Sequence, residues 1–172
     1  PKNNLDNNYL IINSFKKLLT EKHILIIFAT STLRQFTLTA FFTFIAFGIA
    51  TTGGIGESKL GIFSTTGILT TIVFLIGAIG NYTGGQIGSK FSIEKTLTIY
   101  TLLLIPLLLL LGSLEGYRFI LIAPITALIL SGVDPLLQSL IGKYIPSNMQ
   151  GKAFAILYGI GQTIGSSSSY FS

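Results

Sequence analysis

The sequence predicts an all-α membrane protein, a polytopic bundle of five transmembrane helices. Of its 172 residues, 49% are hydrophobic and only 10% are charged, whereas a typical soluble domain carries about 25% charged residues. The apolar residues gather into runs long enough to cross a bilayer, separated by short polar turns. The five spans are expected at about residues 24–50, 60–80, 96–112, 117–142 and 153–172.

The segments outside these spans are short and polar. Residues 1–23 are expected to form a cytoplasmic linker, either with an amphipathic helix at the membrane surface or as a plain connection. Residues 84–95 are interpreted as a Gly/Ser/Lys loop and residues 143–152 as a basic loop. The chain begins at Pro1 and ends inside the last span. We therefore interpret it as a fragment of a longer protein, incomplete at both ends.

The lysines and arginines indicate the orientation of the bundle. Their excess over acidic residues falls on the N-terminal flank, on the 84–95 loop and on the 143–152 loop, which all lie on one side of the predicted bundle. The positive-inside rule makes that side cytoplasmic and explains the net charge of +5 without nucleic acid as a partner. The expected location is the plasma membrane, with the lipid bilayer as a partner.

Two ionisable residues fall in the cores of the predicted spans, Arg34 in the first and Asp134 in the fourth. Charge at that depth is costly, so such a residue is a functional-site hypothesis by default. Because the two charges fall at similar depth, we expect them to meet directly or through water or substrate. Polar stripes at helical spacing accompany them in four spans, while the third span has none and is expected to face lipid. Alternatively, the Ser and Thr side chains simply bond their own backbone. The candidate cavity residues are Arg34, Thr37, Asn81, Asp134, Gln138 and Gln162.

Three stretches resemble the C-terminal half of a major facilitator superfamily transporter, from the seventh to the eleventh helix. The 84–95 loop is similar to the family's Gly-rich loop, roughly G-x-x-x-D-R-x-G-R-R. Gly85 falls on the leading Gly, Ser89 stands where the family has Asp, and Lys90 takes the place of the first Arg. Residues 146–155 resemble the basic loop before the eleventh helix, and residues 15–47 resemble the linker end and seventh helix.

This resemblance implies a function and an architecture. Such a protein is a secondary active transporter that carries a small solute by alternating access, with a coupling proton or cation. It implies a partner in the missing N-terminal half of the same chain. In the family the third helix of each three-helix repeat is peripheral, and the first two line a central cavity built from inverted repeats.

Two other classes of function stay open at this stage, a membrane-embedded enzyme and a structural membrane subunit. An enzyme is disfavoured because the chain has no cysteine, its one histidine is His23 at a span boundary, and Asp134 has no acid close by. No catalytic residue, metal or cofactor is therefore expected. A structural subunit would not need charged residues in the span cores.

Overall fold

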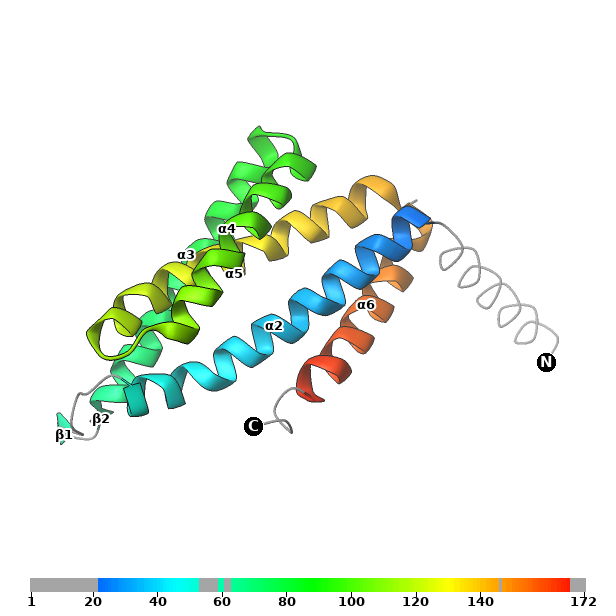
Figure 1. Cartoon of the computed structure of the whole chain (residues 1–172). Helices are drawn as coiled ribbons and strands as arrows, with labels where there is room; N and C mark the ends of the chain where they lie inside the picture. Colours follow the sequence, from blue (N-terminus) through cyan, green and yellow to red (C-terminus); the bar gives the residue numbers. More distant parts are fainter. Residues whose placement is uncertain (1–21, 53–58, 61–62, 146, 168–172) are drawn as a thin grey trace, which may run out of the picture. The chain divides into compact units, whose positions relative to one another are not determined.

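The structure, a computed structural model, describes residues 22–52, 59–60, 63–145 and 147–167 (Figure 1). The described residues are helical apart from one pair of two-residue strands, β1 (Lys59–Leu60) and β2 (Phe63–Ser64). These strands pair antiparallel, with Lys59 opposite Ser64. The predicted linker over residues 1–21 lies outside the described residues. The helices are α2 (Lys22–Thr52), α3 (Thr65–Lys90), α4 (Ile93–Ser113), α5 (Tyr117–Tyr144) and α6 (Ser147–Ser167).

Within the described residues, four helices are long and apolar enough to cross a membrane. They are α2, over Ile24–Thr51, together with the whole of α3, α4 and α5. The chain is thus a helical membrane protein, and these four correspond to the first four predicted spans. The fifth predicted span, 153–172, overlaps α6 as far as Ser167, and its residues 168–172 lie outside the described residues. Helix α6 is not among the four. Gln150, Lys152 and several Gly, Ser and Thr residues make α6 more polar than the others.

The chain folds as two compact units whose boundaries fall inside α2 and α5. The described part of unit 1 comprises the first half of α2 up to Thr37, the end of α5 from Leu140, and α6. Unit 2, Leu38–Ser139, comprises the second half of α2, the short hairpin, α3, α4 and most of α5. Each unit has its own buried residues and is described separately below.

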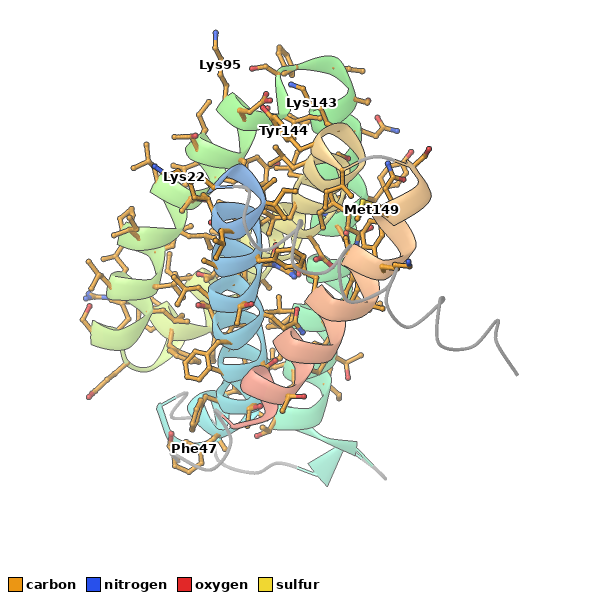
Figure 2. The ribbon with its side chains drawn as sticks, turned by 90° about the vertical axis from the view of Figure 1, so that its right-hand side faces the viewer. Lys22, Phe47, Lys95, Lys143, Tyr144 and Met149 are labelled. Atoms are coloured by element: carbon orange, nitrogen blue, oxygen red, sulfur yellow. The ribbon has the colours of Figure 1, made fainter. Side chains whose placement is uncertain are left out.

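Unit 1 packs around the start of α2. Ile24 and Ile27 are buried against Ile141 and Ile145 at the end of α5 and against Ala153 of α6. Partly buried side chains complete this cluster: Phe28, Met149, Phe154 and Leu157. The first turns of α2 therefore pack against the early turns of α6. Figure 2 shows Lys22 and Lys143 toward this same end of the unit.

A glutamine holds the connection between α5 and α6. The Nε2 atom of Gln150 donates hydrogen bonds to the carbonyl oxygens of Gly142, at 3.1 Å, and Ile145, at 3.0 Å. These carbonyls follow the last complete turns of α5 and have no partner within a helix. The side chain from α6 therefore caps the end of α5.

Unit 2 is organised by a close contact between α3 and α5. Glycines of α3 are buried against the α5 backbone at Leu128 and Gly132 and against the side chain of Leu136. The contacts Gly80–Leu128, Gly84–Gly132 and Gly88–Leu136 advance four residues along both helices together. The two helices therefore run parallel, as two membrane spans separated by a third must.

The remaining helices of unit 2 cover this pair unequally. Gly48 of α2 lies against the ring of Phe119 at the start of α5, and Phe42 of α2 packs on Phe74 of α3 with ring centroids 4.8 Å apart. By contrast, α4 is exposed along most of its length, with Leu109 at 71% exposure, and Leu104 as its one buried large side chain. This exposed surface suits the lipid-facing position expected for the third span.

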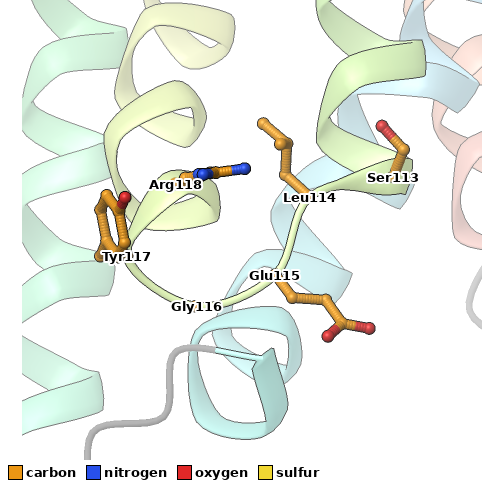
Figure 3. Close-up of a pocket in the computed structure, with 6 residues that line it drawn as sticks. All are labelled: Ser113, Leu114, Glu115, Gly116, Tyr117 and Arg118. Atoms are coloured by element: carbon orange, nitrogen blue, oxygen red, sulfur yellow. The ribbon is translucent and has the colours of Figure 1, made fainter.

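The turn between α4 and α5 is formed by Leu114, Glu115 and Gly116 (Figure 3). Gly116 has φ of 64°, a left-handed conformation that favours glycine. Glu115 and Arg118 lie on opposite sides of the connecting backbone. The Arg118 guanidinium lies 5.9 Å from the ring centroid of Tyr117, and at the other end of α5 the Lys143 ammonium lies 5.5 Å from that of Tyr144. Such tyrosine and cation neighbours are typical of membrane–water interfaces.

Two predicted loops are wrong in extent. The expected loop over residues 84–95 is helical except at Phe91 and Ser92, because the glycines at its start pack against α5 and do not break α3. The backbone stays bonded here, with Phe91 N–H donating to Ile87 O at 3.0 Å. Likewise, most of the expected 143–152 loop is helical. After residue 146, α6 begins at Ser147, six residues before the predicted start of the fifth span.

Candidate functional site

Arg34 lies well inside α2, ten residues after Ile24, on the same helical face as Ile27. Its side chain is half-buried, and its Nη1 donates to the Oε1 of neighbouring Gln35 at 3.3 Å. The Nε atom is fully buried. A guanidinium stays charged under all physiological conditions, so its surroundings must compensate a permanent positive charge.

Ser31 lies one turn before Arg34 on α2 and is 3% exposed. Its hydroxyl oxygen is buried and has no hydrogen-bond partner among the residues that the structure describes. The hydroxyl of Thr70 on α3 is likewise buried without a partner among the described residues, but many other hydroxyl groups bond their own helix. The hydroxyl of Thr37 donates to the carbonyl oxygen of Leu33, four residues earlier, at 3.0 Å. The same arrangement recurs at Thr51, Thr71, Thr96, Thr98, Thr101, Thr126, Ser139 and Thr163.

Asp134 lies in α5 ten residues before Tyr144, in the segment that contacts the glycines of α3. It is half-buried and is followed by Pro135, which has no N–H to donate to the carbonyl of Ser131. Arg34 belongs to unit 1 and Asp134 to unit 2. Each side chain takes part in at least one polar or electrostatic interaction, and their mutual pairing stays a prediction.

The exposed side of α3 carries a polar group that the sequence analysis did not single out. The Nε2 of Gln86 lies 2.6 Å from the hydroxyl of Tyr82, one turn earlier on the same helix. Tyr82 is 68% exposed, and Asn81 beside it is also exposed. By the register of the α3–α5 contact, Gln86 lies level with Asp134. Residues four apart lie on the same face of a helix, so the spacing of this Tyr and Gln could have predicted their contact from the sequence.

The other predicted cavity residues are distributed over four helices. Asn81 is exposed on α3, next to Gly80, which is buried against α5. Gln138 is exposed on α5, one turn after Asp134. Thr37 is half-buried on α2, and its hydroxyl is bonded to its own backbone, as the simpler interpretation of polar stripes expects. Gln162 lies in α6.

The residues of the Gly-rich motif lie at the end of α3. A Cβ atom on Gly85 would stand 3.6 Å from the Cβ of Pro135, an ordinary van der Waals distance. Ser89 is exposed, and its hydroxyl donates to the carbonyl oxygen of Gln86 at 2.8 Å. Lys90 is exposed at the last residue of the helix. This segment is therefore a helix end that carries a basic side chain.

The α4–α5 turn forms no binding site, and the acidic residues of the described segments form no metal site. The turn that joins α4 to α5 lines an open depression of about 580 Å³, formed by residues 113–118 alone, as Figure 3 shows. No polar side chain of that turn is buried, so it lacks the arrangement of a binding site. Among the described residues, no three His, Asp or Glu side chains are grouped so that they could hold a metal ion.

Comparison of the chain with models of protein families, with curated proteins and with solved structures finds no match.

Proposed function

We propose that this chain is part of a secondary active transporter, similar in architecture to the C-terminal half of a major facilitator superfamily protein, which moves a small solute by alternating access. The observation that carries the proposal is the presence of one ionisable side chain deep inside each of two candidate membrane helices. Arg34 and Asp134 each lie ten residues from the nearer end of their span, about 15 Å along a helix. Intramembrane charges of this kind mark substrate and ion pathways.

The exposed polar side chains support a water-filled pathway. Asn81 and Tyr82 on α3 and Gln138 on α5 are all exposed on helices that are apolar enough to cross a membrane. Exposed polar side chains are unfavourable in hydrocarbon, so their presence on these helices favours a water-filled cavity beside them. Asp134, next to the helix-weakening Pro135, is the proposed site of the coupling proton or cation.

The close α3–α5 contact supports movement of rigid groups of helices. Glycines allow the two backbones to touch along several turns, which favours a pair that moves as one body. Alternating access in transporters built from repeats is largely a rocking of such bodies around a site near the membrane midplane. The basic residues on alternate connections favour a cytoplasmic N-terminal flank.

Solute counterflow in proteoliposomes tests this proposal. The full-length protein is reconstituted, the vesicles are loaded with one unlabelled solute from a panel of carboxylates, phosphates, amino acids and sugars, and uptake of the same labelled solute is followed. A transporter gives transient accumulation that exceeds equilibrium, which neither an enzyme nor a structural subunit produces. Protein-free vesicles and the Arg34→Gln variant are the controls. Absence of accumulation with every member of the panel would contradict the proposal.

A further inference from the structure

The packed face of α2 changes from apolar to polar along the helix, between Ile27 and Ser31. Ile24 and Ile27 of this face are buried in the core of unit 1. The next positions on the same face, by helical spacing, are Ser31 and Arg34. Ser31 is as buried as the isoleucines, and Arg34 is half-buried. Ser31 and Arg34 therefore lie on the same packed face of α2 as the buried isoleucines, and not on an exposed face.

The hydroxyl of Ser31 is available for a partner that the described residues do not supply. Nine Ser and Thr hydroxyls on the described helices donate to a carbonyl oxygen four residues earlier, whereas that of Ser31 does not. Burial without a hydrogen bond is unfavourable for a hydroxyl group. Its oxygen can accept one hydrogen bond and its proton can be donated in another.

Arg34 adds donors of fixed geometry one turn further along. Its guanidinium presents five N–H groups in a planar fork that matches carboxylate and phosphate oxygens. The hydrogen bond from Nη1 to Gln35 restricts the orientation of this fork. A permanent positive charge beside a buried hydroxyl repels cations and favours an anionic group.

We propose that Ser31 and Arg34 form a subsite for the carboxylate or phosphate group of the transported solute. This inference rests on the proposed transport function and assigns the class of solute, an organic or inorganic anion. The guanidinium binds two oxygens of the anion, and the Ser31 hydroxyl donates a hydrogen bond to it from one turn away.

Ligand-dependent thermal stability of the full-length protein in detergent tests binding separately from transport. Sodium lactate and sodium phosphate are the anionic probes, glucose is the uncharged control, and choline chloride is the control for a cation and for ionic strength. A ligand that binds only the folded protein raises the unfolding temperature with concentration. One of the two anions should do so, and glucose and choline should not.

The variants separate binding from a general loss of structure. Arg34→Gln should weaken anion affinity by at least about a hundredfold, and Ser31→Ala by about tenfold, as expected for losing hydrogen bonds to a charged group. Arg34→Lys keeps the charge but loses the fork, so its affinity should lie between wild type and Arg34→Gln. Thr101→Val is the matched control, because its hydroxyl bonds only its own backbone on the exposed helix α4. It should bind the anion as wild type does.

Three results would overturn the subsite. The first is that neither anion stabilises the protein. The second is that Arg34→Gln and Ser31→Ala both bind the anion as tightly as wild type. The third is that phosphatidylglycerol stabilises the protein while the soluble anions do not, which would identify the ligand as a lipid headgroup. Counterflow distinguishes this proposal from the transport proposal. If an uncharged or cationic solute shows counterflow that Ser31→Ala does not change, transport is supported and the anion subsite is contradicted. Anion binding without counterflow of any solute would retain the subsite and remove transport.

Discussion

The Gly80→Ala substitution should destabilise the protein by forcing α3 away from α5. An alanine Cβ would stand 2.7 Å from the Cα and carbonyl carbon of Leu128, and closer still to its carbonyl oxygen. Ordinary contacts begin near 3.4 Å. The two backbones must therefore separate by at least about 0.7 Å, which forfeits a quarter to a half of the dispersion energy of each contact along the interface.

Overpacking of this kind costs about 1–3 kcal/mol. For a protein of this size, such a loss should lower the unfolding temperature by roughly 5 °C. The measurement is the fraction of the detergent-solubilised full-length protein that stays monodisperse after heating, followed by size-exclusion chromatography. Gly80→Leu, with a larger side chain, should be worse than Gly80→Ala.

Two further glycines on the same unit serve as matched controls. On Gly85, a Cβ would make an ordinary contact with Pro135 at 3.6 Å, and on Gly112 of α4 it would meet no atom within 4 Å. Both Gly85→Ala and Gly112→Ala should therefore unfold at or slightly above the wild-type temperature, because alanine favours helix more than glycine does. If Gly80→Ala proves as stable as Gly112→Ala, the close contact between α3 and α5 is refuted.

Three other predictions concern the lipid-facing helix, the cap of α5 and the orientation. Leu109→Ile on the exposed side of α4 should leave both stability and transport unchanged, because volume and polarity are conserved; a strong loss of either would place this side against protein. Gln150→Leu should lower the free energy of unfolding by about 1–2 kcal/mol, since two carbonyls at the end of α5 lose their donor; unchanged thermal stability would contradict the cap. Ser147→Cys should be labelled by a membrane-impermeant thiol reagent only in opened cells, and labelling in intact cells would reverse the predicted orientation.

The sequence was sufficient to place the membrane-length helices but not all of their ends. Long apolar runs locate α2, α3, α4 and α5, because the length needed to cross a bilayer is fixed. Gly84 and Gly88 fall in the predicted 84–95 loop because glycine is common in turns, although glycines four residues apart also indicate close helix contact. In this protein they permit helix contact and leave the hydrogen bonding of α3 intact. Which helix those glycines touch depends on packing, which periodicity does not reveal.

The sequence predicted the charged residues of the candidate site, but it did not predict the hydrogen bonds of its hydroxyl groups. Arg34 and Asp134 stand out because few residues of their kind occur in apolar runs. By contrast, the difference between Ser31 and Thr37 is invisible in sequence, since both lie on one polar stripe. Only the structure shows that one hydroxyl bonds its own helix and that the other is buried without a described partner. The Tyr82–Gln86 contact was missed because neither residue carries a charge.

A double-mutant cycle on transport tests most directly whether the two intramembrane charges serve the proposed function together. The initial rate of solute counterflow is measured in proteoliposomes for wild type, Arg34→Gln, Asp134→Asn and the double variant, all at equal reconstituted protein. Removing one member of a buried pair leaves an uncompensated charge, which costs about 3–5 kcal/mol, whereas removing both restores neutrality. The account predicts that each single variant loses transport and that the double variant is less impaired than the two losses combined. Full activity in both single variants would contradict the functional role of these charges, and strict additivity would contradict their pairing.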